Sequence, residues 1–72
     1  MSRESFMIEE LVKDIVLRLM EEDKMPMTDA LDMVYNSDTY EKISDLATGL
    51  FSQSTAYVYS ILQRELKEGK IG

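Results

Sequence analysis

Apolar residues recur three and four positions apart along the whole chain and nowhere alternate strictly with polar residues over the length of a strand. Spacing of three and four places side chains on one side of an α-helix, whereas strict alternation is typical of a strand. The pattern therefore predicts an all-α fold in which residues 1–72 form a single small bundle of about four helices. The first and last helices are expected to be long, with two short helices between them.

The first two helices are bounded by capping residues and a proline. The first is expected from about Ser5 to Asp23, with Ser2 or Ser5 as its N-cap. It ends near Lys24, because the Met25-Pro26 step disfavours the helical conformation. The second helix is expected to start at Thr28, as N-cap. Its inward side chains are predicted to be Leu31, Val34 and Tyr35.

The last two helices are bounded by turn residues and glycines. Asn36-Ser37-Asp38 is typical of a turn followed by a new cap, and this predicts a third helix through Ala47. Gly49 closes this helix as a left-handed residue. The fourth helix is expected to begin after Ser52 or Ser54 and to end at Gly69. The apolar sides of the two helices are predicted to hold Tyr40, Ile43, Leu46 and Ala47, and Val58, Ile61, Leu62 and Leu66, respectively.

The first helix carries apolar residues on its outer side as well as on its core side. The main apolar face of this helix is predicted to hold Ile8, Leu11, Val12, Ile15, Leu19 and Met20. Phe6 and Leu17 lie outside this face and eleven positions apart, which places them about three turns apart along one line. Met20 lies at the edge of this second strip. Single exposed apolar side chains are normal on soluble proteins, so the strip has an ordinary explanation. It also suits two-fold self-association, in which Phe6, Leu17 and Met20 would form the contact.

The fourth helix has a broad apolar arc of about 200°. Tyr57 and Tyr59 belong to this arc and are either core residues or contacts for a partner. The other side of the helix holds Arg64 and Lys67 and forms a basic face. Glu65 falls inside the apolar arc, and we expect it at the exposed rim, because burying an unpaired carboxylate is costly.

The composition lacks the side chains that most catalytic and zinc-binding sites use. The chain has 72 residues, with 8 Lys and Arg, 14 Asp and Glu, and neither His nor Cys. Without His it lacks the side chain whose unperturbed pKa lies near neutral pH, and without Cys it lacks a thiolate nucleophile. It also lacks the usual zinc ligands, which are these two residue types. We expect a protein that is not an enzyme and that uses no cofactor and no metal.

The charge and the length of the apolar runs restrict the partners. A formal net charge of −6 disfavours nucleic acid and anionic lipid, because like charges repel. The apolar runs are too short to span a bilayer or to form a signal peptide. We therefore expect a cytoplasmic protein without a membrane segment.

The segment SQSTAYVYSILQRELKEGKIG, residues 52–72, has a Ser- and Thr-rich start, an early Tyr, a pair of Leu residues, basic residues and a closing Gly. It resembles the recognition helix of winged-helix transcription regulators. The resemblance implies phosphate contacts from Arg64 and Lys67. It implies base contacts from Ser54, Thr55, Tyr57 and Tyr59. The chain departs from that family after Gly69, where only Lys70, Ile71 and Gly72 follow in place of a wing hairpin.

A second pattern covers residues 40–66: a helix that contains Tyr40, then Thr48-Gly49-Leu50-Phe51, Gln53-Ser54 and Tyr57-Val58-Tyr59. This TGL-aromatic-x-QS segment with a final YVY helix resembles a family of short uncharacterised bacterial proteins, a domain of unknown function. The resemblance implies a small helical fold and assigns no reaction.

Two functions are consistent with these observations. The first is a non-enzymatic protein–protein interaction or regulatory module that forms a homodimer. In this module the surface for a further protein partner would be Tyr57, Tyr59, Arg64 and Lys67. The alternative is a small, wingless helix-turn-helix-like DNA-binding regulator that uses the C-terminal helix.

Overall fold

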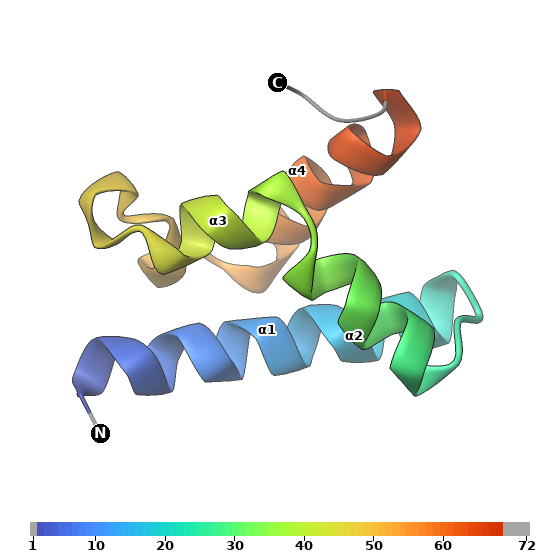
Figure 1. Cartoon of the computed structure of the whole chain (residues 1–72), viewed down its shortest axis with the longest axis horizontal. Helices are drawn as coiled ribbons and strands as arrows, with labels where there is room; N and C mark the ends of the chain where they lie inside the picture. Colours follow the sequence, from blue (N-terminus) through green and yellow to red (C-terminus); the bar gives the residue numbers. More distant parts are fainter. Residues whose placement is uncertain (1, 69–72) are drawn as a thin grey trace.

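The computed structural model describes residues 2–68 and contains four α-helices and two short 3₁₀ turns (Figure 1). The helices are α1 (Arg3–Glu22), α2 (Met27–Tyr35), α3 (Asp38–Ser44) and α4 (Thr55–Glu68). The turns η1 (Leu46–Thr48) and η2 (Leu50–Ser52) join α3 to α4. No strand occurs between residues 2 and 68, so the expected all-α fold, with long first and last helices and two short helices between, is confirmed.

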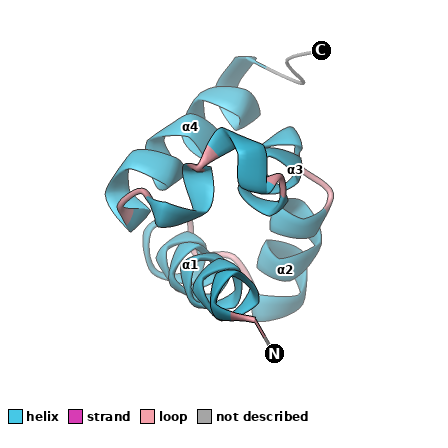
Figure 2. Ribbon diagram, turned by 90° about the vertical axis from the view of Figure 1, so that its left-hand side faces the viewer, coloured by secondary structure: helices cyan, strands magenta, loops and turns pink. Residues whose placement is uncertain are grey.

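The four helices surround a common centre, and α1 forms one border of the molecule. α1 contacts α2, α3, α4 and η2. Figure 1 and Figure 2 both show it along the lower edge, with the other helices above it or beside it. One side of α1 therefore faces the core, and the opposite side points away from the rest of the described chain.

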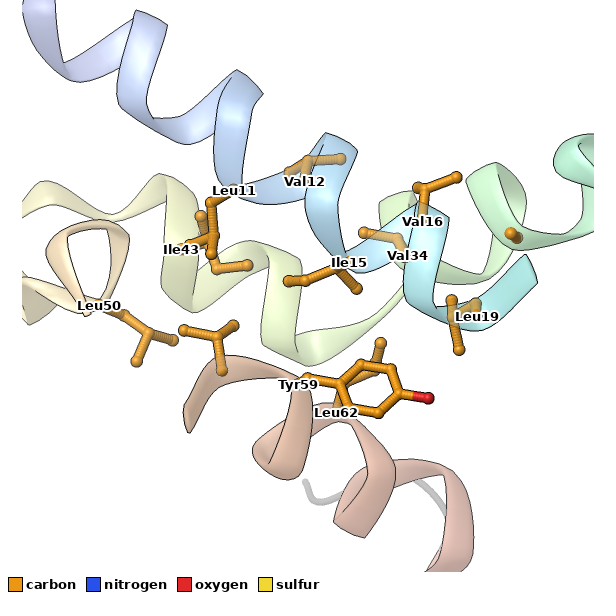
Figure 3. Close-up of a cluster of buried hydrophobic side chains, with 12 residues drawn as sticks. Leu11, Val12, Ile15, Val16, Leu19, Val34, Ile43, Leu50, Tyr59 and Leu62 are labelled. Atoms are coloured by element: carbon orange, nitrogen blue, oxygen red, sulfur yellow. The ribbon is translucent and has the colours of Figure 1, made fainter. Parts of the chain in front are cut away.

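The core is built from apolar side chains of all four helices (Figure 3). Burying a side chain of this size contributes about 1.5–3 kcal/mol. Each of the most deeply buried residues lies on an apolar face that the sequence pattern predicts. They are Ile15, Leu19, Val34, Ile43, Val58 and Leu62.

Serine side chains cap three of the four helices. The hydroxyl oxygen of Ser2 accepts a hydrogen bond from the backbone N–H of Ser5 at 3.1 Å and begins α1. Ser37 caps α3 in the same way at 3.0 Å, and Ser54 accepts from Tyr57 at the start of α4 at 3.2 Å. Each bond satisfies a backbone donor of the first turn that has no partner within its helix.

The expected start of α2 is wrong. The helix begins at Met27, and its N-cap is Pro26 rather than Thr28. Pro26 has φ −63° and ψ 152°, which is the extended conformation of an N-cap residue, so the chain enters the helix directly after the proline. The end of α1 is close to its expected position, since Asp23 is the C-cap and Lys24 reverses the chain with a φ of 58°.

α3 ends at Ser44, three residues before its predicted end at Ala47. Asp45 leaves the helical conformation with a ψ of 104°, and its carboxylate accepts a hydrogen bond from the N–H of Ala47 at 3.0 Å. This bond begins η1 and leaves Leu46 exposed instead of inward. Gly49 is left-handed, as expected, with a φ of 68° at the end of η1. The predicted end of the fourth helix, Gly69, lies outside the described residues.

Tyr35 is exposed, so its predicted inward position is wrong. Ala30 and Val34, one turn apart, form the buried side of α2. Tyr35 is rotated by about 100° from Val34 and turns away from the core. Its ring packs edge-on against Tyr40, with 4.9 Å between the ring centroids.

Glu65 of α4 is a buried carboxylate that binds the first turn of α3. The residue is only 5% exposed. Its Oε2 accepts a hydrogen bond from the N–H of Asp38 at 2.9 Å, and its Oε1 accepts from the N–H and the hydroxyl of Thr39 at 2.9 and 2.7 Å. The predicted position at the exposed rim is wrong, because the unpaired donors of a helix N-terminus, a favourable place for negative charge, compensate for the loss of water.

The pKa of Glu65 reflects two opposing effects. Burial raises the pKa of this carboxyl, but the hydrogen bonds from Thr39 and Asp38, with the positive charge of Lys42, lower it to below its ordinary value. A carboxylate whose pKa is lower in the folded state stabilises the fold at pH values above its unfolded pKa. This stabilisation is lost as the pH falls through the folded pKa.

Glu65→Gln is expected to lower the free energy of unfolding at neutral pH by about 1–3 kcal/mol, because the amide replaces one acceptor oxygen with a donor that faces backbone N–H groups. Urea unfolding followed by circular dichroism measures the change. The difference from the wild type should shrink as the pH falls below about 4.3, the usual pKa of a glutamate in an unfolded chain. It should be smallest once the pH lies below the lower pKa that Glu65 has in the folded state. Glu68→Gln, on the same helix and exposed, is the matched control and should change little. A difference that is the same at neutral and acidic pH would contradict this role for Glu65.

Candidate functional site

Phe6 and Leu17 lie exposed on the side of α1 that faces away from the core, which we call the outer face of α1. Their exposed fractions are 57% and 45%. Met20, the third residue of the predicted strip, is half-buried and packs against the core. The structure thus places two large apolar side chains in water on the longest helix, with Met20 at the boundary.

An apolar groove of about 320 Å³ runs between α1 and α2, beside Leu17. Met27 and Tyr35 on α2 are exposed and form its far wall. Sequence reasoning missed both residues, because it placed Tyr35 in the core and the start of α2 after Met27. The lining residues are Glu9, Val12, Lys13, Val16, Leu17, Met20, Met27, Leu31 and Tyr35.

A second, shallower groove of about 230 Å³ lies on the other flank of α1, beside Phe6. Phe51 of η2 is half-buried on its opposite wall. Phe6 and Leu17 therefore share the outer face but border different grooves. The outer face is a ridge with a groove on each side.

The two candidate tyrosines of α4 have different environments. Tyr57 is 53% exposed, whereas Tyr59 is 8% exposed and belongs to the core (Figure 3). Assigning Tyr59 to a partner surface, or to base contacts in a DNA-binding helix, is therefore wrong. The apolar arc predicted for α4 is so broad that it contains both tyrosines and does not indicate which one is buried. Packing against α1 determines that Tyr59 is the buried one.

Tyr59 lies beside the charged end of α1. Its ring lies under the guanidinium of Arg18, with 5.5 Å from Cζ to the ring centroid. Burial, together with the negative charges of Asp23 and Glu22, raises the pKa of the Tyr59 hydroxyl, while Arg18 opposes the shift. The ring thus serves as a packing surface whose hydroxyl stays protonated at neutral pH.

Arg64 and Lys67 are exposed on α4 and line a groove of about 760 Å³. Apolar side chains from the turn after α1, from α2 and from α4 border the same groove: Met25, Met33 and Leu66. Asp23 and Glu68 also line it, so the basic character expected of this face is diluted by acidic groups. Tyr57 does not line this groove, and the four predicted partner-surface residues do not form one site.

Within residues 2–68, no group of three or more Asp and Glu side chains is placed to hold a metal ion. Over the same range one ion pair is present, between Arg18 and Glu22 at 3.9 Å. No helix in the described part of the chain is long and apolar enough to cross a membrane.

Comparison of this chain with protein-family models, with curated proteins and with solved structures gives no match. The resemblance of residues 40–66 to a family of short bacterial proteins stays a prediction.

The difference between the two tyrosines can be measured. Tyr59→Ala is expected to lower the free energy of unfolding by about 3 kcal/mol or more, because it leaves a cavity in the core. Tyr57→Ala should change it by no more than about 0.5 kcal/mol, as is usual for an exposed side chain. Chemical unfolding of both variants under the same conditions provides the comparison. Equal losses in the two variants would show that Tyr57 is also a core residue.

Proposed function

We propose that this chain is a non-enzymatic protein–protein interaction module that self-associates through the outer face of α1. The observation that supports this most directly is the exposure of Phe6 and Leu17 on one side of the longest helix. A contact that covers the exposed half of both side chains removes apolar surface from water and therefore has a favourable driving force.

The size of the chain gives a second reason. A single core of roughly this length buries only about 60% of the surface that the unfolded chain exposes, and oligomerisation is a common source of further stability. A two-fold contact uses the same patch twice, so one exposed strip is sufficient for both copies. The absence of His and Cys leaves binding as the simplest role for such a surface. A location in the cytoplasm is part of this proposal.

A further protein partner would use the groove beside Arg64 and Lys67. Met25 and Met33 supply adaptable apolar contacts there, since methionine side chains adjust to irregular surfaces. Arg64 and Lys67 would favour acidic groups at the rim of the contact. This second surface is separate from the outer face of α1, so the module could bind a copy of itself and a partner together.

Leu17→Glu is expected to lower the apparent mass in analytical ultracentrifugation to that of the monomer, because the substitution places a charge in the proposed contact. The helical signal in circular dichroism should stay unchanged. Leu46→Glu is the matched control, since Leu46 is 53% exposed but lies on η1, and this variant should self-associate as the wild type does. A wild type that is monomeric at high micromolar concentration would contradict self-association.

A small helix-turn-helix-like DNA-binding regulator is the second candidate. What favours it is the exposure of Arg64 and Lys67 within the last turns of α4, with the short α3 packed against α4. The burial of Tyr59 and the acidic neighbours Asp23 and Glu68 weaken it. We therefore rank this candidate below the interaction module.

Titration with mixed-sequence duplex DNA distinguishes the two candidates. For the interaction module we expect no measurable binding even at low salt. A regulator with two phosphate contacts would bind at low salt, and the logarithm of its affinity would fall with the logarithm of salt concentration with a slope of about −1.8. Arg64→Ala with Lys67→Ala should abolish any such binding, and binding that these substitutions remove would favour the regulator.

A further inference from the structure

The residues of the outer face of α1 follow alternating steps of three and four positions. This is the spacing of the contact line between two paired helices, in which alternate residues occupy the two core positions of a seven-residue repeat. On α1 this line of residues lies on the side opposite Ile15 and Leu19, which face the core. We call the set the seam of α1, and its members are Arg3, Phe6, Glu10, Lys13, Leu17 and Met20.

The seam is accessible in the described chain. Five of its six residues are exposed, and Met20 is half-buried. Neither Glu10 nor Lys13, the charged pair at its centre, takes part in an ion pair within residues 2–68. Two side chains of opposite charge thus lie between two apolar ones, Phe6 and Leu17, and all four side chains are exposed.

The charges distinguish the two ways of pairing this seam with a copy of itself. In a parallel pair each position meets its own counterpart, so Glu10 would face Glu10 and Lys13 would face Lys13. Like charges facing each other destabilise such a contact. In an antiparallel pair the two core positions of the repeat face each other, so Glu10 of one copy lies opposite Lys13 of the second.

The same antiparallel register matches the apolar residues. If residues 10 and 13 are opposite, then residues 6 and 17 are also opposite, because the position numbers of facing residues have a constant sum. Phe6 of each copy then packs on Leu17 of the other, and the stem of Arg3 lies against Met20. Two-fold symmetry produces each contact twice.

We propose that two copies of this chain pair through α1 in antiparallel orientation, with Glu10 of each copy opposite Lys13 of the other. This inference rests on the proposed function, to which it adds the geometry of the contact. The grooves on both sides of the ridge leave room for side chains of the second helix that flank the seam. The central charges contribute little to affinity at an exposed site but select the orientation and the register.

Charge exchange tests the geometry. With Lys13→Glu, two acidic side chains face each other in both of the symmetric contacts between positions 10 and 13. With Glu10→Lys, two basic side chains face each other in both contacts. Each single variant should weaken the dimer by about tenfold, measured by sedimentation equilibrium. The double variant Glu10→Lys with Lys13→Glu restores opposite charges in the antiparallel register and should return to the wild-type affinity. Mixing the two single variants should also restore association, as a heterodimer.

Lys67→Glu, which reverses an exposed charge on α4, is the matched control and should leave the dimer unchanged. Circular dichroism of each variant verifies that the fold is retained. A wild type that dimerises but is insensitive to the exchange, or a double variant that remains weak, would overturn the antiparallel seam and leave self-association standing. A monomeric wild type would overturn both.

Discussion

Burial of one side of α1 against all the other helices is the constraint on which the rest of the structure depends. Ile15 and Leu19 lie at the centre of this contact and have no exposed surface. Because α1 is a straight element and the core lies on one side of it, its opposite side stays exposed within residues 2–68 (Figure 1). The exposure of Phe6 and Leu17 is therefore a consequence of how α1 packs. The candidate site and the core residues of α1 therefore lie on opposite faces of the same helix.

The short helix α3 depends on a second contact. Seven residues are too few for a helix to be stable on its own, since nucleation is unfavourable and few backbone hydrogen bonds form. Ser37 and Glu65 satisfy the donors of its first turn, one from the adjacent residue and one from α4. Ile43 then anchors the helix in the core. Local capping, a distant carboxylate and apolar burial together hold an element that none of them would hold alone.

Periodicity was sufficient to predict the four helices and their most deeply buried residues, because burial at positions such as Val58 and Leu62 follows from spacing along one helix. It was not sufficient for residues whose environment depends on a different element. Glu65 is buried because α3 presents its N-terminus there, which no pattern within α4 indicates. Tyr57 and Tyr59 lie in one apolar arc and differ only through the position of α1. For the candidate site, the outer strip was visible in the sequence, whereas the grooves beside it required the position of α2 and η2.

The bond between Glu65 and the start of α3 also bears on how the chain is made. The two partners are 26 and 27 positions apart in sequence, and the acceptor follows the donors. A chain that emerges from the ribosome therefore presents the residues of α3 well before the carboxylate that caps them. The complete cap of α3 can therefore form only after Glu65 has also been synthesised.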